Sequence, residues 1–178
     1  MPPIHHSDRA FSLPGFLTGE ECGQLIELAE AKGFDAASVR TAGGAQSMPQ
    51  VRNNERVLVE SPEWVQRLWQ RLQAAGLPAV EGQMARGLPK DLRFYKYSPG
   101  QRFKMHKDGP WTESGLTSQL TLLVYLNEAF TGGSTDFREL VVQPNTGAAL
   151  LFLHDTWHEG AAVQAGTKYV LRSDVLYG

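Results

Sequence analysis

The chain has 178 residues, of which 42% are hydrophobic and 20% are charged, and its formal net charge is −2. These values are ordinary for a soluble globular protein, and we expect one domain over residues 1–178. No basic stripe runs along the sequence, so nucleic acid is disfavoured as a partner. Cys22 is the only cysteine, which excludes an intramolecular disulfide and fits a reducing compartment.

The amino terminus has neither the cationic nor the apolar region of a signal peptide, and no apolar run is long enough to cross a membrane. We therefore expect a cytoplasmic protein without a membrane partner. His5 and His6 lie in a terminus that we expect to be loosely held, and we assign them no role. Nothing in the sequence indicates an oligomeric state.

Residues 10–14 are short and apolar, and they predict an edge strand. A helix follows over about residues 19–32. Thr18 and Glu21 form a capping box at its start, and Gly33 marks its end.

Ser61 and Pro62 predict the start of a second helix, because a capping serine precedes a proline at the first helical position. This helix runs to about residue 75, so the helices occupy mainly residues 15–80. The apolar stripe that it is expected to bury consists of Val65, Leu68, Trp69 and Leu72.

From about residue 90 to residue 178 the chain consists of short β-rich runs separated by turn signals. Helices followed by many short strands indicate an α+β fold, with a sandwich or barrel packed against the helices. The predicted strands are residues 92–97, 102–106, 118–126, 134–137, 140–142, 148–153 and 168–177.

Residues 40–56 are polar and rich in glycine, and their pattern fits no regular element. One interpretation is a surface loop or ragged hairpin. The other is a mobile lid over a site. The sequence leaves both open.

His106 and Asp108 lie two positions apart at the end of a predicted strand, so their side chains share one face. With His158 they supply two imidazoles and one carboxylate. That is the ligand set of a facial triad, which holds Fe(II) and leaves the opposite positions open. A His-x-Asp pair alone is also common in ordinary surface turns.

His154 is a rival ligand, because it lies four positions before His158. A helical zinc pair has this spacing, but the glutamate of that motif is absent and residues 148–153 read as a strand. We therefore expect His154 and Asp155 to lie behind the metal ligands rather than among them.

Lys168 begins the last predicted strand, whose alternation aligns Lys168, Val170, Arg172 and Asp174 on one face. Either cation can bind a carboxylate ligand, and the spacing does not choose between them. A salt bridge to Asp174 is the alternative role for Arg172. Tyr97 either reaches into a cavity with its hydroxyl group or packs in the core.

Several segments together resemble the prolyl 4-hydroxylase-like family of Fe(II)/2-oxoglutarate oxygenases over about residues 92–177. After His158, the family's valine, glycine and lysine follow at five, eight and ten positions. The matching segments are YSPGQRFKMHKD at 97–108, LLVYLN at 122–127, GGSTDF at 132–137, VQPNTG at 142–147 and the run from His158 to Lys168.

The resemblance implies a double-stranded β-helix (jelly-roll) core with N-terminal supporting helices. It implies that His106, Asp108 and His158 bind the iron and carry the catalysis. It also implies residues that bind 2-oxoglutarate: Lys168 for the C5 carboxylate, Tyr97 as a hydroxyl partner, Tyr125 and Thr135 at cavity-facing positions, and Arg172 as a helper.

On the substrate side the sequence departs from the family, because Asp174 stands where a large aromatic is usual. Trp111 follows Asp108 in a predicted loop, where it either contacts substrate or folds back over the core. We expect Trp111 and Asp174 to border the substrate.

The family's activity couples oxidation of 2-oxoglutarate by O₂, to succinate and CO₂, with hydroxylation of an unactivated C–H. The resemblance implies Fe(II), 2-oxoglutarate and O₂, with ascorbate as an auxiliary reductant. The expected substrate is a prolyl or other residue in a peptide or protein. The alternatives are a free amino acid or small metabolite, or a metal-binding jelly-roll without catalysis.

Overall fold

The computed structural model describes residues 2–37, 39–41 and 43–178. Its helices are α1 (Gly19–Lys32) and α2 (Pro62–Ala75). In chain order the strands are β1 (Ile4–Ser7), β2 (Ala10–Leu13), β3 (Asp35–Ala36), β4 (Val39–Thr41), β5 (Gly44–Gln46), β6 (Glu55–Glu60), β7 (Ala85–Gly87), β8 (Asp91–Tyr97), β9 (Phe103–His106), β10 (Thr112–Glu113), β11 (Leu116–Tyr125), β12 (Phe130–Gly132), β13 (Thr135–Phe137), β14 (Val141–Val142), β15 (Ala149–Leu153), β16 (His158–Gly160), β17 (Val163–Gly166) and β18 (Lys168–Tyr177).

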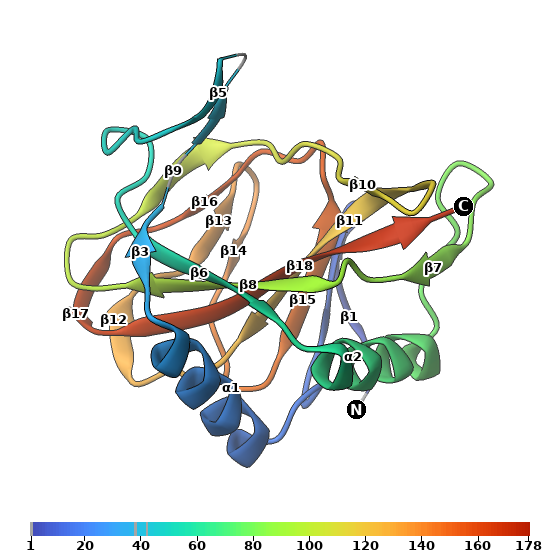
Figure 1. The fold of residues 1–178 in the computed structure, drawn as a ribbon, viewed down its shortest axis with the longest axis horizontal. Coiled ribbons are helices and arrows are strands. Elements are labelled where there is room, and N and C mark those ends of the chain that lie inside the picture. The colour runs from blue at the N-terminus through green and yellow to red at the C-terminus, as the bar shows by residue number, and fades with distance from the viewer. Residues whose placement is uncertain (1, 38, 42) are drawn as a thin grey trace.

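A larger and a smaller sheet face each other as a jelly-roll (Figure 1), and β12 with β17 and β4 with β5 form two further two-stranded sheets. The larger sheet has the order β1–β2–β15–β11–β18–β8–β6–β3, with β10 and β7 paired to β11 and β18. The smaller sheet has the order β14–β13–β16–β9. Both helices lie outside the jelly-roll, against the larger sheet (Figure 1). The predicted fold class is confirmed.

Alternation along the strands divides the buried side chains between two cores. On β11, Leu122 faces outward and packs in the cluster that contains Leu25 of α1 and Leu68 of α2. Tyr125 of the same strand belongs to the second cluster, between the two sheets. Other members of this inner core are Tyr95, Tyr97, Phe137, Phe152, Val163 and Val170. The inner core surrounds the candidate site.

The capping box predicted for α1 is present. The Thr18 hydroxyl accepts from the Glu21 N–H (3.1 Å), and the Glu21 carboxylate accepts from the Thr18 N–H (3.0 Å). Glu21 also binds Arg71 of α2 at 2.7 and 2.8 Å, which ties the helices together. None of the described helices is long and apolar enough to cross a membrane.

Ser61 caps α2 as predicted, but the buried stripe of this helix differs from the expectation. Leu68 and Leu72 are buried, whereas Val65 and Trp69 are only partly buried. The third buried position is Trp64, which completes an i, i+4, i+8 stripe. Both tryptophans fit an apolar stripe, so the pattern alone did not fix the helix rotation.

The amino terminus is not loose, and residues 10–14 do not form an edge strand. Ile4–Ser7 forms β1, which pairs with β2, and β2 lies between β1 and β15. His6 Nε2 and Ser12 Oγ are 2.7 Å apart across the pair. Because β1 is largely exposed on both faces, its sequence lacks the alternation by which a strand is predicted.

The segment 40–56 begins with a hairpin of β4 and β5, and its last residues start β6. Arg52 and Asn54 are buried, and Arg52 forms a backbone bridge with Phe103 beside the site. The segment therefore borders the site and is packed in part. Its action as a mobile lid stays a prediction, and residue 42 lies outside the described residues.

Candidate active site

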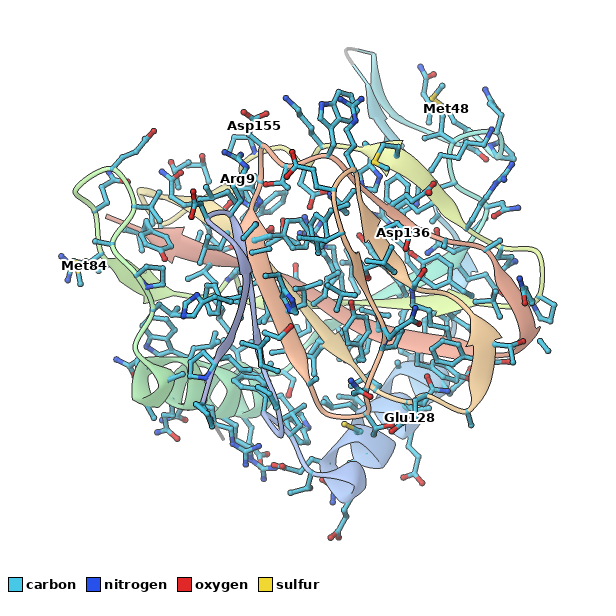
Figure 2. All side chains as sticks on the ribbon, turned by 180° about the vertical axis from the view of Figure 1, so that it is seen from behind. Arg9, Met48, Met84, Glu128, Asp136 and Asp155 are labelled. Atoms are coloured by element: carbon cyan, nitrogen blue, oxygen red, sulfur yellow. The ribbon has the colours of Figure 1, made fainter. Side chains whose placement is uncertain are left out.

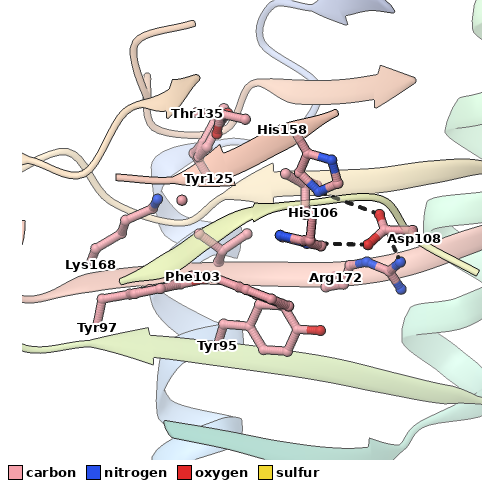
Figure 3. Close-up of a pocket in the computed structure, with 13 residues that line it drawn as sticks. Tyr95, Tyr97, Phe103, His106, Asp108, Tyr125, Thr135, His158, Lys168 and Arg172 are labelled. Atoms are coloured by element: carbon pink, nitrogen blue, oxygen red, sulfur yellow. Dashed lines mark hydrogen bonds and ion pairs between the residues drawn. The ribbon is translucent and has the colours of Figure 1, made fainter. Parts of the chain in front are cut away.

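Strands β9 and β16 place two histidines next to each other. His106 and His158 are direct partners in this antiparallel pair, and their ring centroids are 4.2 Å apart. Asp108 follows β9, with Oδ1 3.4 Å from His106 Nε2 and Oδ2 3.5 Å from His158 Nε2. One ligand atom from each residue lies within 4.8 Å of the others. Figure 3 shows the three groups converging at one end of the cavity.

Hydrogen bonds to the backbone orient both imidazoles. His106 Nδ1 lies 2.6 Å from the Lys104 carbonyl, and His158 Nδ1 lies 2.8 Å from the Thr156 carbonyl. An Nδ1–H that donates to the carbonyl leaves the Nε2 lone pair for a metal. Burial also lowers the pKa of His158 to about 4, so this imidazole is neutral at pH 7. The donor set fits Fe(II).

The Asp108 carboxylate is buried but ionised. Burial alone would raise its pKa, yet the Arg172 guanidinium and the two imidazoles hold the pKa of Asp108 well below its usual range. Arg172 Nη2 lies 3.1 Å from Asp108 Oδ2, and Thr121 donates to the same oxygen at 2.6 Å. The third ligand is therefore charged at any physiological pH.

Lys168 lies at the other end of the same cavity (Figure 3). Its side chain is only 2% exposed, and its Nζ lies 4.7 Å from the centroid of the Tyr97 ring. Burial lowers the pKa of Lys168 to about 7, against the opposing effect of Asp136. Within the described part of the chain, no carboxylate forms an ion pair with Lys168. A buried cation facing a cavity fits the far carboxylate of 2-oxoglutarate.

The predicted hydroxyl groups line the same cavity. Tyr97, Tyr125 and Thr135 all face it, and Tyr125 Oη lies 2.6 Å from Thr135 Oγ1. Burial raises the pKa of both tyrosines, so both phenols stay protonated and able to donate. Their roles toward 2-oxoglutarate remain predictions, but the structure brings them to the required place.

The structure separates the two cations that the sequence left as alternatives. Lys168 and Arg172 share one face of β18, about 13 Å apart at the rise of an extended strand. Arg172 lies at the ligand end, where it binds Asp108 (3.1 Å) and Asp174 (3.0 Å). Its guanidinium is thus engaged by two carboxylates, and Lys168 is the better candidate for the cosubstrate.

A groove of about 690 Å³ opens beside the ligand residues. His106, Asp108 and Trp111 all line it, and Trp111 is 42% exposed, so Trp111 does not fold back over the core. Asp174 also lines the groove, but it is 1% exposed and ion-paired with Arg93 at 2.5 Å. The Asp174 carboxylate therefore forms ion pairs with Arg93 and Arg172 and is not exposed to a substrate.

His154 and Asp155 lie in different environments, although we expected both to lie behind the metal ligands. His154 is buried, and its Nδ1 lies 2.8 Å from Thr121, which holds Asp108. Asp155 is exposed, where it binds Lys107 (2.7 Å) and its carbonyl accepts from Arg9 (Figure 2). The expectation is therefore wrong for Asp155.

Sequence reasoning missed Arg93, Tyr95, Phe103 and Thr121 at this site. Alternation would have found two of them, since Tyr95 shares a strand face with Tyr97, and Thr121 with Tyr125. The Phe103 ring stacks on His106 with centroids 3.6 Å apart. Regular alternation would place residues three positions apart on opposite faces, but the register of β9 against β16 shifts between these two residues.

Comparisons with known proteins agree with this geometry. Residues 92–173 match the family model described as the 2OG-Fe(II) oxygenase superfamily. Almost half of the chain is thus similar to the 2OG-Fe(II) oxygenase superfamily. This span contains Asp108 and Lys168 with the rest of the cavity, and the resemblance to prolyl 4-hydroxylase-like members is confirmed.

One curated relative and two solved structures illustrate the similarity. The relative, "Putative prolyl 4-hydroxylase" of Acanthamoeba polyphaga mimivirus, is 24% identical over 92% of this chain and 72% of its own. The viral collagen prolyl hydroxylase of Paramecium bursaria Chlorella virus-1, a 2-oxoglutarate complex, is 23% identical with a TM-score of 0.69, covering 96% of this chain and 97% of its own. A Trichoplax adhaerens prolyl hydroxylase, in complex with a hypoxia-inducible factor peptide fragment, is 18% identical with a TM-score of 0.70, covering 96% and 84%.

The protein is a 2-oxoglutarate-dependent dioxygenase that uses Fe(II), 2-oxoglutarate and O₂. The alternative of a metal-binding jelly-roll without catalysis is set aside. The residues described above fit both Fe(II) and 2-oxoglutarate, because three metal ligands lie at one end of a cavity and a buried lysine lies at the other.

The buried state of Lys168 predicts how 2-oxoglutarate binding depends on pH. Its pKa is about 7, and only the protonated amine pairs with a carboxylate. Affinity should therefore be full below pH 7 and fall by up to about tenfold per pH unit above it, until the pKa of the bound state is reached. Calorimetric titration of the Mn(II)-loaded protein at pH 6.5–9 measures this. Lys168→Arg is the control, because arginine stays charged, and equal slopes for both proteins would refute the prediction.

Proposed function

We propose that this enzyme hydroxylates a residue within a peptide or protein, with a prolyl residue as the preferred target. The observation that carries the proposal is the groove beside the ligand residues, which is only partly enclosed and is lined by the exposed Trp111. Support also comes from the fold shared with prolyl hydroxylases, one of which was solved with a peptide. A cytoplasmic location stays a prediction from the sequence.

Each part of the site has a distinct task in this proposal. His106, Asp108 and His158 would hold the iron, which activates O₂ for the coupled oxidation of 2-oxoglutarate and substrate. Lys168 fixes the far carboxylate of 2-oxoglutarate, so its other end is directed toward the three ligand residues. The buried aromatic and hydroxyl side chains keep the cavity dry.

The groove would position the substrate. Arg52, Tyr95 and Trp111 line it together with the ligand residues His106 and Asp108. Aromatic surfaces at its rim provide rigid contacts for an apolar ring such as that of proline.

A mass-spectrometric screen tests the substrate class. The protein is incubated with Fe(II), 2-oxoglutarate and either proline-containing peptides or free amino acids, with and without ascorbate, whose requirement is itself a prediction. Gain of one oxygen atom by peptides, dependent on 2-oxoglutarate, is the expected result. Oxygen gain by free amino acids alone would show that the substrate is a small molecule.

Trp111 provides a second prediction about the groove. We expect Trp111→Ala to impair substrate-coupled turnover but to spare the slow decarboxylation of 2-oxoglutarate without substrate, because Trp111 lies outside the cosubstrate cavity. Loss of a rigid aromatic contact costs about 1–4 kcal/mol in binding, so the substrate KM should rise at least several-fold. The ratio of succinate to hydroxylated product measures the coupling. Trp157→Ala, another exposed tryptophan, is the control, and an unchanged ratio for Trp111→Ala would remove Trp111 from the substrate site.

A further inference from the structure

A hydrogen bond and an ion pair that hold Asp108 meet at the same carboxylate oxygen. Thr121 Oγ1 donates to Asp108 Oδ2 at 2.6 Å, and Arg172 Nη2 lies 3.1 Å from that atom. Each carboxylate oxygen lies near one ligand nitrogen, with Oδ1 3.4 Å from His106 Nε2 and Oδ2 3.5 Å from His158 Nε2, but Oδ1 receives neither of the two contacts. The carboxylate is therefore held from one side.

A chain of hydrogen bonds fixes Thr121 in turn. Because the Thr121 hydroxyl gives its only hydrogen to Asp108, the contact with His154 Nδ1 (2.8 Å) must be donated by the imidazole. His154 Nε2 then accepts from the Ser118 hydroxyl (2.7 Å), and Ser118 accepts from the Trp111 N–H (2.8 Å). Each group in this chain donates one hydrogen to the next, so all four hydrogen bonds run in the same direction, from Trp111 to Asp108.

Arg172 is fixed from the opposite side. Its Nη1 lies 3.0 Å from Asp174 Oδ1, and the other Asp174 oxygen binds Arg93 at 2.5 Å. Asp174 is 1% exposed and Arg172 is 5% exposed, so water does not screen these pairs. The aspartate at the family's aromatic position thus has a role, which is to hold the arginine that holds Asp108.

We propose that Thr121 and Arg172 are positioning residues that hold Asp108 by Oδ2 and reserve Oδ1 for the metal. A carboxylate that binds through one oxygen occupies one coordination position, and this leaves room for a cosubstrate and O₂ opposite the triad. The inference rests on the assignment of Asp108 as an iron ligand but not on the nature of the substrate.

Metal affinity tests this proposal without any substrate. Mn(II) is titrated into the wild-type protein, Thr121→Val, Thr121→Ser and Thr117→Val. Thr121→Val keeps the shape but removes the hydroxyl group, and we expect its Mn(II) affinity to fall about 10-fold or more. Thr121→Ser restores the donor and should restore the affinity. Thr117→Val removes an exposed hydroxyl of the same strand that contacts Thr112 instead, so its Mn(II) affinity should match wild type.

If Thr121→Val folds poorly, a second variant and the Co(II) absorption spectrum still test whether these residues position Asp108. Arg172→Lys retains the charge beside Asp174, but a single ammonium does not span both carboxylates. The Co(II) absorption spectrum should change in Arg172→Lys and Thr121→Val, since a freed carboxylate alters the coordination, and should not change in Thr117→Val. Wild-type Mn(II) affinity and an unaltered Co(II) spectrum in both variants would overturn the positioning role. Failure of the wild-type protein to bind Mn(II) would overturn the iron site itself.

Discussion

His158→Ala should abolish turnover of 2-oxoglutarate while leaving the fold intact. The substitution removes one of three metal ligands, and the neutral imidazole has no substitute within reach among the described residues. The two cores are built from apolar side chains rather than around the metal, so the loss of unfolding free energy should stay within about 0.5–3 kcal/mol.

Succinate formation and thermal unfolding are measured together for this variant. His106→Ala should behave in the same way, because His106 is the direct strand partner of His158. His5→Ala is the matched control, since this exposed histidine lies on β1 and outside the cavity. Full 2-oxoglutarate turnover by either variant would refute the assignment of His106 and His158 as metal ligands.

Lys168→Ala is expected to raise the KM for 2-oxoglutarate much more than it weakens metal binding. Removing the partner of a buried ligand carboxylate costs roughly 2–5 kcal/mol, a factor of about 30 or more. Steady-state KM for 2-oxoglutarate and the Mn(II) dissociation constant are compared in the same preparation. The KM for 2-oxoglutarate should rise while the Mn(II) dissociation constant changes little, because Lys168 and the ligand residues occupy opposite ends of the cavity.

Two variants serve as controls for Lys168→Ala. Lys96→Ala removes a lysine from the neighbouring strand that binds Glu30 on the outer face, and its KM should be that of wild type. Arg172→Lys should show the reverse pattern, with weaker metal binding and a smaller change in KM. A large KM effect in Arg172→Lys with none in Lys168→Ala would exchange the roles of the two cations.

Local patterns predicted most of what positions the site. The ends of β18 (Lys168–Tyr177) agree with the predicted strand, and its alternation correctly placed Lys168 and Arg172 on one face. The capping residues of α1 and α2 also agree, because capping depends on neighbours in sequence. The assignment of His106, Asp108 and His158 came from their order and spacing, and the structure brings them together.

The rest depended on contacts between distant segments. Strand β1 is held by pairing with β2 rather than by a hydrophobic face, so its polar sequence gave no signal. The role of Asp174 required knowledge that Arg93 of β8, the strand partner of Arg172, reaches the Asp174 carboxylate at 2.5 Å. Likewise, His154 and Asp155 are adjacent in sequence, yet only the fold shows that the first turns inward and the second outward.

The most direct test of this account is the crystal structure of the protein grown with Mn(II) and 2-oxoglutarate in the absence of O₂, with the metal located by its anomalous scattering. The account predicts one metal bound by His106 Nε2, His158 Nε2 and one oxygen of Asp108, and a far carboxylate of 2-oxoglutarate paired with Lys168 Nζ. A metal bound elsewhere, or a far carboxylate paired with Arg172 instead of Lys168, would contradict it.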